Sequence, residues 1–312
     1  MASTLLLRPL RLGTRVSALA RWQAEWVAAR LREQGVDVEL VPVTTRGDQQ
    51  STQAIGAIGG DGLFTKELQR ALLDNAIDLA VHSLKDLPTE PVDGLVLAAV
   101  PARGPVGDVL VSRAGTTLEQ LPAGATIGTG SLRRRAQLLH SRPDLVMKDI
   151  RGNVDTRLRK LRDGDFDALV LAEAGLARLG LTAEITERLP ASMMLPAVGQ
   201  GALGIECRAD DQPTRAAVTL LDHTDTHWGV DAERSMLRAL SGGCLAPVAG
   251  WGRVEQDGTL HLTGVVLSAD GQQRLAAEHT GAAETADALG RQVAAALLAE
   301  GAAELIRAAR GV

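Results

Sequence analysis

A pattern of local segments occurs twice in the chain, and this repeat constrains the fold more than any other feature of the sequence. Each copy begins with a short apolar strand that ends in Gly-Thr, at Leu10–Gly13 and again at Ile127-Gly128-Thr129. A serine follows each strand, Ser17 and Ser131, and serine is among the preferred N-cap residues of helices. Amphipathic helical patterns run on from both serines. The two junctions therefore predict the same strand–turn–helix unit.

The likeness between the two copies continues beyond these helices. A second predicted strand leads to Arg46-Gly47-Asp48 in the first copy and to Arg151-Gly152-Asn153 in the second. Further on, LLDNAIDLAVHS at 72–83 aligns with LRDGDFDALVLA at 161–172. Strands that alternate with helices are typical of α/β domains, and self-similarity indicates repeated units. We predict two related α/β domains, with chance similarity of two ordinary amphipathic patterns as the alternative.

Beyond Asp222 the pattern changes to a helix, two strands and a long Ala-rich helix at 283–299, which predicts a smaller α+β domain. The predicted fold class is therefore α/β, with two related α/β domains and a smaller C-terminal α+β domain. The first domain is predicted to comprise 5–101 together with 200–220, the second 106–196 and the third 223–312. The Pro/Gly-rich segment PARGPVGD marks the first boundary.

Composition excludes several classes of function. The formal net charge is −5, whereas nucleic-acid-binding domains are normally basic, and aromatic residues that could stack on bases make up only 2%. No apolar stretch is long enough to span a membrane, and the N-terminal region lacks the features of a secretory signal. The two cysteines, Cys207 and Cys244, fit a reducing cytoplasm. The six histidines show no metal-ligand spacing, so we expect no metal site.

The segment Gly128–Lys160 is strongly basic within this acidic chain. Nine Lys and Arg residues against three Asp give it a charge of +6, in a chain of net charge −5. Such a local excess indicates an anion site, and guanidinium groups bind carboxylates or phosphates through paired hydrogen bonds. Anions bind at helix N-termini beyond the carboxyl ends of strands. The predicted members of this site are Arg15, Ser17, Ser131, Arg133, Arg134, Arg151 and Arg157. By contrast, Arg135, Arg142 and Arg159 are predicted to lie on solvated helix faces.

Two loops carry further candidates. HSLKDLP at 82–88 follows an apolar strand, and Asp86 within it is a candidate for proton transfer or for stabilising a cation. A surface ion pair between Lys85 and Asp86 is the alternative. In SGGCLAP at 241–247, glycines and a proline indicate an accessible thiol at Cys244, either a nucleophile or attachment point or a chance free cysteine. Cys207 lies in a strand-like segment and is predicted to be buried.

These motifs together resemble the porphobilinogen deaminase family, also called hydroxymethylbilane synthases. The matching segments span nearly the whole chain and are LGTRVSALARWQAE, TTRGD, GGDGLFTKEL, AVHSLKDLPT, GTGSLRRRAQL, RPDL, RGNVDTRL, LPAVGQGALGIECR and AERSMLRALSGGC. The resemblance implies a three-domain transferase of tetrapyrrole biosynthesis, whose first two domains would be doubly wound α/β domains like those of periplasmic binding proteins. Such an enzyme condenses four porphobilinogen molecules head to tail into hydroxymethylbilane and releases ammonia. The resemblance also implies a cytoplasmic monomer, with no nucleic-acid or membrane partner.

The resemblance further implies a dipyrromethane cofactor held by a thioether on Cys244. Asp86 would be the catalytic residue, stabilising a cationic pyrrole and transferring protons. The other residues that would hold the cofactor are Asp48, Ser83, Lys85, Ser131, Arg133 and Arg134. Those that would bind the carboxylates of the substrate are Arg15, Ser17, Arg151, Arg157 and Arg178. Carboxylates on every pyrrole ring would explain why so many guanidinium groups are needed.

The sequence departs from the family pattern at three positions of interest. Ala57 and Asp61 stand where many members have lysines, and Gly130 replaces a frequent serine. Asp61 would repel a nearby carboxylate. Two rival hypotheses follow: a non-catalytic organic-anion-binding protein of the same two-domain fold, and an inactive homologue. The absence of a predicted export signal and the presence of Cys244 favour the enzyme over the binding protein.

Overall fold

The structure, a computed structural model, describes residues 8–43, 63–241 and 246–310. The chain forms two compact units, Met1–Arg103 with Ala202–His227, and Gly104–Gly201 with Trp228–Val312. The boundary at Arg103–Gly104 falls within the Pro/Gly-rich segment singled out in the sequence. The described residues also form three separate sheets. The assignment of three domains with the boundaries given above stays a prediction.

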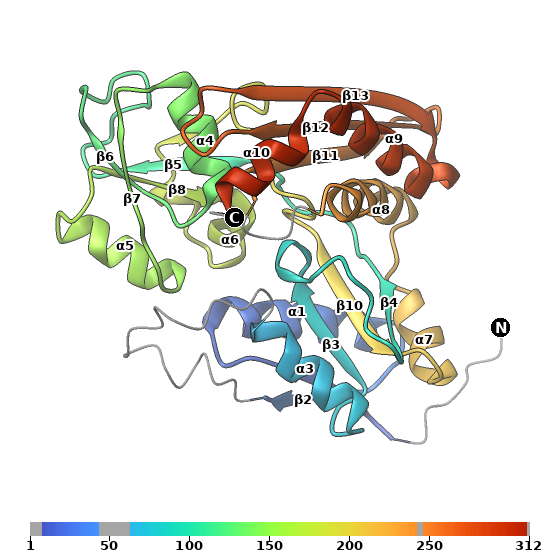
Figure 1. The fold of residues 1–312 in the computed structure, drawn as a ribbon. Coiled ribbons are helices and arrows are strands. Elements are labelled where there is room, and N and C mark those ends of the chain that lie inside the picture. The colour runs from blue at the N-terminus through green and yellow to red at the C-terminus, as the bar shows by residue number, and fades with distance from the viewer. Residues whose placement is uncertain (1–7, 44–62, 242–245, 311–312) are drawn as a thin grey trace. The chain divides into compact units, whose positions relative to one another are not determined.

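The first unit is built on a five-stranded mixed sheet of order β2-β1-β3-β10-β4 (Figure 1). Its strands are β1 (Leu10–Thr14), β2 (Val38–Pro42), β3 (Leu79–Ser83), β4 (Leu95–Ala99) and β10 (Leu203–Arg208). β1 is parallel to β2 and β3, whereas β10 is antiparallel to both of its neighbours. Helices α1 (Ala18–Glu33) and α7 (Gln212–Thr219) pack on one face, and α3 (Leu63–Leu73) packs on the other. The sheet is the middle layer of an α/β sandwich.

The second unit contains a five-stranded sheet of order β7-β6-β8-β5-β9. Its strands are β5 (Asp108–Ser112), β6 (Thr126–Gly128), β7 (Val146–Lys148), β8 (Ala168–Ala172) and β9 (Glu187–Arg188). α4 (Leu132–Ser141) covers one face, while α5 (Val154–Arg162) and α6 (Glu173–Arg178) cover the other. A 3₁₀ turn, η2 (Thr182–Glu184), precedes β9.

A three-stranded antiparallel sheet completes the second unit. Its strands are β11 (Val248–Val254), β12 (Thr259–Leu267) and β13 (Arg274–Ala282). One face packs on α8 (Thr224–Ala239), α9 (Ala286–Ala299) and α10 (Ala302–Ala309), with the 3₁₀ turn η3 (Ala283–Thr285) before α9. The other face meets α4 through Ala136, Ala249 and Val265. This small α+β part agrees with the expectation for the C-terminal end, although β11 was not predicted.

The repeat predicted from the sequence is confirmed. The two five-stranded sheets have the same strand order once β1, β3 and β10 are matched to β6, β8 and β5, and the same parallel and antiparallel pairings. Asp78 and Asp167, which the alignment made equivalent, each accept a hydrogen bond from a backbone N–H of the neighbouring parallel strand, at 2.8 Å in both. Such a shared side-chain contact argues against chance similarity.

In the part of the chain that the structure describes, no helix combines the length and apolar character that a membrane span requires.

Candidate functional site

The carboxyl end of β3 presents three of the predicted site residues. Ser83 ends the strand, and Lys85 and Asp86 lie in the 3₁₀ turn η1 (Leu84–Asp86) that follows. Ser83 Oγ accepts a hydrogen bond of 2.7 Å from Gln23 Nε2 of α1. Leu84 is buried beneath the turn, while Asp86 is exposed. The apolar strand and the buried Leu84 thus anchor the turn to the core, and the carboxyl group of Asp86 is left exposed to solvent.

The first Gly-Thr junction carries Arg15 and Ser17. Ser17 is the N-cap of α1, and its hydroxyl accepts a hydrogen bond from the Ala20 N–H at 3.4 Å. The buried Thr14 hydroxyl donates to the Ala20 carbonyl at 3.1 Å and so ties the strand end to the helix. A Cβ on Gly13 would lie 2.3 Å from Ile77 Cδ1, which explains the glycine. The predicted strand–turn–helix geometry is confirmed.

At the second junction Ser131 is likewise the N-cap, of α4, and accepts from the Arg134 N–H at 3.4 Å. Both arginines of this junction are paired with a carboxylate of the chain itself. Arg133 Nη1 lies 2.7 Å from Asp108 Oδ2, and Arg134 Nη2 lies 2.7 Å from Asp108 Oδ1. Burial alone would raise the pKa of Asp108, but the two guanidinium groups outweigh it and hold that pKa well below its usual value.

This buried cluster changes what the two arginines can offer to a ligand. Asp108 matches one of their two positive charges, and both side chains are buried. Arg134 also donates to the Val170 carbonyl at 3.1 Å, and Arg133 to the Leu195 carbonyl at 2.6 Å. Arg133 Nε is buried and has no hydrogen-bond partner among the described residues. The role of Arg133 and Arg134 in cofactor binding stays a prediction. In that role, the cluster of the two arginines and Asp108 would offer the cofactor one net positive charge.

The remaining arginines of the predicted site lie in different surroundings. Arg151 is exposed in the turn before α5, and Arg157 Nε donates to the Gly152 carbonyl at 2.8 Å. Arg178, in the last turn of α6, donates to the Gly201 carbonyl at 2.7 Å. Burial lowers the pKa of Arg178 to about 10, so it stays positively charged at neutral pH. In the second unit, Arg151 is the member most open to an external carboxylate.

One assignment to the solvated helix faces was wrong. Arg135 and Arg159 are exposed, as predicted. Arg142, however, is only partly exposed, because its guanidinium donates to the carbonyls of Leu118 and Leu121 and pairs with Asp144 at 2.6 Å. Pro143 stops α4 at this point, and the guanidinium instead ties the helix end to a neighbouring loop. The number of charged residues in a segment does not distinguish an arginine that binds backbone carbonyls from one that is solvated.

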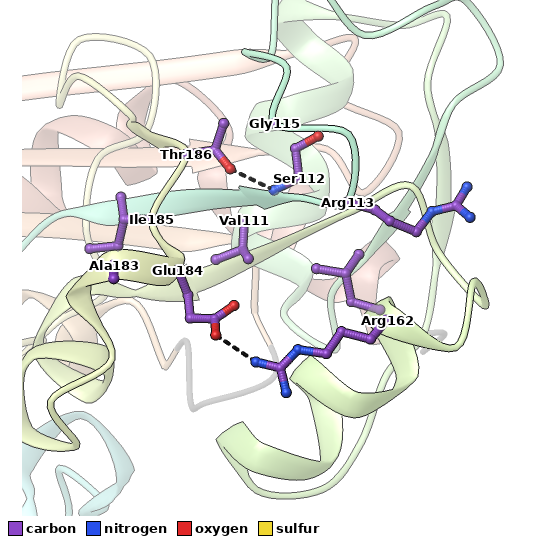
Figure 2. Close-up of a pocket in the computed structure, with 10 residues that line it drawn as sticks. Val111, Ser112, Arg113, Gly115, Arg162, Ala183, Glu184, Ile185 and Thr186 are labelled. Atoms are coloured by element: carbon purple, nitrogen blue, oxygen red, sulfur yellow. Dashed lines mark hydrogen bonds and ion pairs between the residues drawn. The ribbon is translucent and has the colours of Figure 1, made fainter.

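A cavity of about 510 Å³ in the second unit lies away from all of these residues (Figure 2). Its walls include Ser112, Arg162 and Glu184, and Figure 2 shows Arg162 paired with Glu184 across it. Ser112 pairs with Ala168 at the amino end of β8, whereas the predicted site occupies the carboxyl ends of the parallel strands. The cavity is therefore not the predicted anion site.

Several predicted residues lie outside the residues that the structure describes, namely Asp48, Ala57, Asp61 and Cys244. Cys207 is buried, as predicted, and burial raises the pKa of its thiol to about 11. Among the described residues, no group of His, Cys, Asp and Glu side chains is arranged to hold a metal ion.

Sequence reasoning missed Gln23 and Asp108, which position predicted residues. Gln23 is a polar residue beside the apolar face of α1, and this position was a signal in the sequence. In the structure its side chain is buried, with 3% exposure. Asp108 had no such signal. The antiparallel pairing of β5 with β8 places it beside two arginines that are distant in sequence.

Comparison with known proteins decides the family. Residues 10–216 match the family model "Porphobilinogen deaminase, dipyromethane cofactor binding domain", and 228–299 match "Porphobilinogen deaminase, C-terminal domain". The chain belongs to the porphobilinogen deaminase family. It is 52% identical to the porphobilinogen deaminase of Desulforudis audaxviator over 305 residues, which cover 97% of this chain and 98% of that protein. It is 51% identical to that of Xanthomonas euvesicatoria over 299 residues, 95% of this chain and 98% of that protein.

Solved structures that align with this member of the porphobilinogen deaminase family include proteins that bind amino acids. An arginine-specific one from Salmonella typhimurium covers 69% of this chain, with 91% of its own length matched, 15% identity and a TM-score of 0.40. The methionine-binding protein MetQ covers 72%, with 94% of its own length, 14% identity and a TM-score of 0.41. The fold class rests on the strand order and pairings described above, not on these scores.

Gly130, where the resemblance led us to expect a serine, lies against the backbone of a neighbouring segment. A Cβ at Gly130 would lie 2.9 Å from the Ile150 carbonyl oxygen, a backbone atom that cannot swing away. A serine at this position would therefore require the turn before α4 to shift. Gly130 fits the local backbone of this chain without such a shift.

Proposed function

We propose that this chain is an active porphobilinogen deaminase that condenses four porphobilinogen molecules into hydroxymethylbilane with release of ammonia. The observation that carries the proposal is the exposed carboxyl group of Asp86, held at the carboxyl end of β3. It supports an enzyme over a silent homologue, because a carboxylate in that position can take up a proton and stabilise a neighbouring cation. Family matches along nearly the whole chain support the same activity.

The described residues fit a dipyrromethane cofactor. Its carboxylates require positive partners, and the second unit offers the N-terminal end of α4 at Ser131. It also offers the buried Arg133 Nε, which has no hydrogen-bond partner in the described part of the chain. When bound through Cys244, this group would supply the pyrrole carbon to which the first substrate is joined. We propose that Asp48, Ser83, Lys85, Ser131, Arg133 and Arg134 hold it.

The chain's own residues would orient porphobilinogen and stabilise the positive charge that develops on the reacting pyrrole. We propose that Asp86 holds the proton transferred at the reacting pyrrole and stabilises positive charge there. Arg15, Ser17, Arg151, Arg157 and Arg178 would bind the carboxylates of porphobilinogen. Because these contacts lie away from the reacting carbon, their binding energy can position it for attack. The exposed guanidinium of Arg151 supports this role most directly.

We further infer a monomer in the cytoplasm, without nucleic-acid or membrane partners. The net charge of −5 supports the absence of nucleic acid, and the free thiol of Cys207 suits a reducing compartment. Light scattering of the purified protein should give a mass near 32.7 kDa. A multiple of that value would contradict the monomer.

Intact-mass spectrometry tests the enzyme against both rivals. Protein from a host that makes porphobilinogen should carry an adduct of two pyrrole units, and Cys244→Ser should lack it. A Cys207→Ser variant is the matched control and should keep the adduct, because Cys207 is buried in β10. An unmodified wild-type mass would favour the binding protein or the inactive homologue.

A further inference from the structure

Buried polar side chains hold the end of β3 from both faces of its sheet. Successive residues of a strand point to opposite faces, so His82 and Ser83 face different layers. On the side of α1, the Ser83 hydroxyl accepts its hydrogen bond from Gln23. On the side of α3, His82 meets Glu206 of the neighbouring strand β10. Of these four, only Ser83 has a role in the proposed reaction.

The contact on the α3 side is a chain of three side chains. His82 Nε2 lies 3.0 Å from Glu206 Oε2, a close contact whose geometry is not that of a hydrogen bond. Gln69 Nε2 donates to both carboxyl oxygens of Glu206, at 3.0 and 3.2 Å. Their exposures are 4% for His82, 5% for Glu206 and 7% for Gln69. Burying a carboxyl group costs free energy, and apolar residues at the same positions would avoid that cost. A buried network of polar contacts, however, makes the elements that it connects more rigid. Here it joins β3, β10 and α3.

The turn with Asp86 is fastened to the same strand, β10. The Leu84 N–H donates to the Ala202 carbonyl at 3.1 Å, just before β10 begins. Two residues on, a Cβ at Gly204 would lie 2.6 Å from Leu84 Cδ1, so the glycine makes room for the buried leucine. Glu206 follows at the next alternate position and contacts His82. Ala202, Gly204 and Glu206 thus lie on one face of the sheet and contact the turn or the end of the strand that precedes it.

We propose that Glu206, His82 and Gln69 are positioning residues that fix the turn bearing Asp86. The proposal rests on the proposed function, in which Asp86 carries out proton transfer. A catalytic group displaced by about 1 Å can cost about 100-fold in rate. A looser turn should therefore lower kcat, while KM, which depends on contacts made elsewhere by arginines, should change little.

Three variants of the cofactor-loaded enzyme test this. Glu206→Ala removes the network and should lower kcat at least 10-fold, with KM within twofold. Glu206→Gln keeps the shape and an oxygen acceptor for Gln69, and should restore kcat to within about threefold of wild type. Val218→Ala is the stability control, because it creates a cavity between α7 and the sheet on the face opposite α3, away from Gln69 and Glu206. It should lower Tm and leave kcat unchanged.

Hydrogen exchange gives a readout that does not depend on turnover. In Glu206→Ala the peptide spanning 83–88 should exchange at least 10-fold faster than in wild type, and Val218→Ala should show no such change. Unchanged kcat and exchange in Glu206→Ala would overturn the proposal, as would a Glu206→Gln variant no better than Glu206→Ala. An Asp86→Ala variant that keeps full turnover would instead refute the role given to Asp86 and leave the exchange result standing.

Discussion

At the scale of single residues, Asp86 and Asp108 show two opposite uses of a carboxyl group. Asp86 is exposed at the tip of a turn, where its charge is available to a ligand. Asp108 is fully buried, and its charge is used by Arg133 and Arg134 of the same chain. Exposure therefore separates the proposed catalytic carboxylate from a structural one.

Replacing Asp86 by Ala should reduce turnover by about 10²–10⁴-fold, the usual contribution of general acid–base catalysis. The adduct on Cys244 should remain, because cofactor attachment is proposed to depend on other residues. Steady-state kinetics and intact mass on one preparation check both parts. Glu90→Ala, which removes another exposed carboxylate shortly after the turn, is the control and should leave turnover unchanged. Activity close to wild type in Asp86→Ala would refute its catalytic role.

Replacing Asp108 by Asn should destabilise the protein by about 3–5 kcal/mol, because it leaves two buried guanidinium groups without a counter-charge. Urea unfolding followed by circular dichroism measures this. Asp144→Asn is the matched control, since Asp144 also pairs with an arginine, Arg142, but at the surface, where ion pairs contribute little. Similar unfolding midpoints in the two variants would show that the buried cluster does not stabilise the fold.

The same cluster predicts a pH dependence. The pKa of Asp108 in the folded state lies below its usual value, because Arg133 and Arg134 outweigh the effect of burial. Its contribution to stability is then complete above the unfolded-state pKa of about 3.9 and is lost as the pH falls towards the lower folded pKa. The difference in unfolding free energy between wild type and Asp108→Asn should shrink below about pH 4. A difference that grows in acid would contradict this sign.

At the scale of elements, the sequence predicted what depends on local patterns. Alternating apolar residues and serine caps located β1, α1, β3 and α4, and the repeat predicted that Asp78 and Asp167 would be equivalent. β11 was missed because two glycines, Gly250 and Gly252, weaken its strand pattern. They are there for a tertiary reason, since a Cβ at Gly252 would lie 2.3 Å from the Gly229 carbonyl oxygen of α8. The pairing of Arg133 and Arg134 with Asp108 was also tertiary and could not be read locally.

The turn before α4 offers a prediction at this scale. Gly130→Ala should destabilise the second unit, because its Cβ would lie 2.9 Å from the Ile150 carbonyl oxygen. Gly175→Ala in α6 is the control, because Val154 Cγ2, at 4.0 Å, is the one described atom outside the helix's own backbone that its Cβ would meet. Alanine favours a helix over glycine by about 1 kcal/mol, so this variant should be neutral or slightly stabilised. Thermal unfolding compares them, and a Gly130→Ala protein as stable as wild type would show that the turn can shift freely.

At the scale of the whole molecule, the small antiparallel sheet belongs to the same compact unit as β5–β9. Besides the apolar contact of α4 with this sheet, the hairpin between β12 and β13 touches the end of α4. His140 Nδ1 lies 2.8 Å from the Gly271 carbonyl oxygen. A Cβ on Gly271 would lie 2.5 Å from the Ala136 carbonyl oxygen. This close approach suggests that the two sheets unfold together.

We therefore predict that Gly271→Ala lowers the hydrogen-exchange protection of β12 and of β8 alike, and leaves β3 of the other unit unchanged. Gly258→Ala, in the hairpin between β11 and β12, is the matched control. Both glycines have a positive φ, +76° and +82°, but a Cβ at Gly258 would meet no atom of the described residues within 4 Å. Each alanine costs about 1–2 kcal/mol in backbone strain. Any destabilisation by Gly271→Ala beyond that caused by Gly258→Ala is therefore due to the contact with α4. Equal effects of the two variants, or a loss of protection in β12 without one in β8, would show that the C-terminal sheet unfolds on its own.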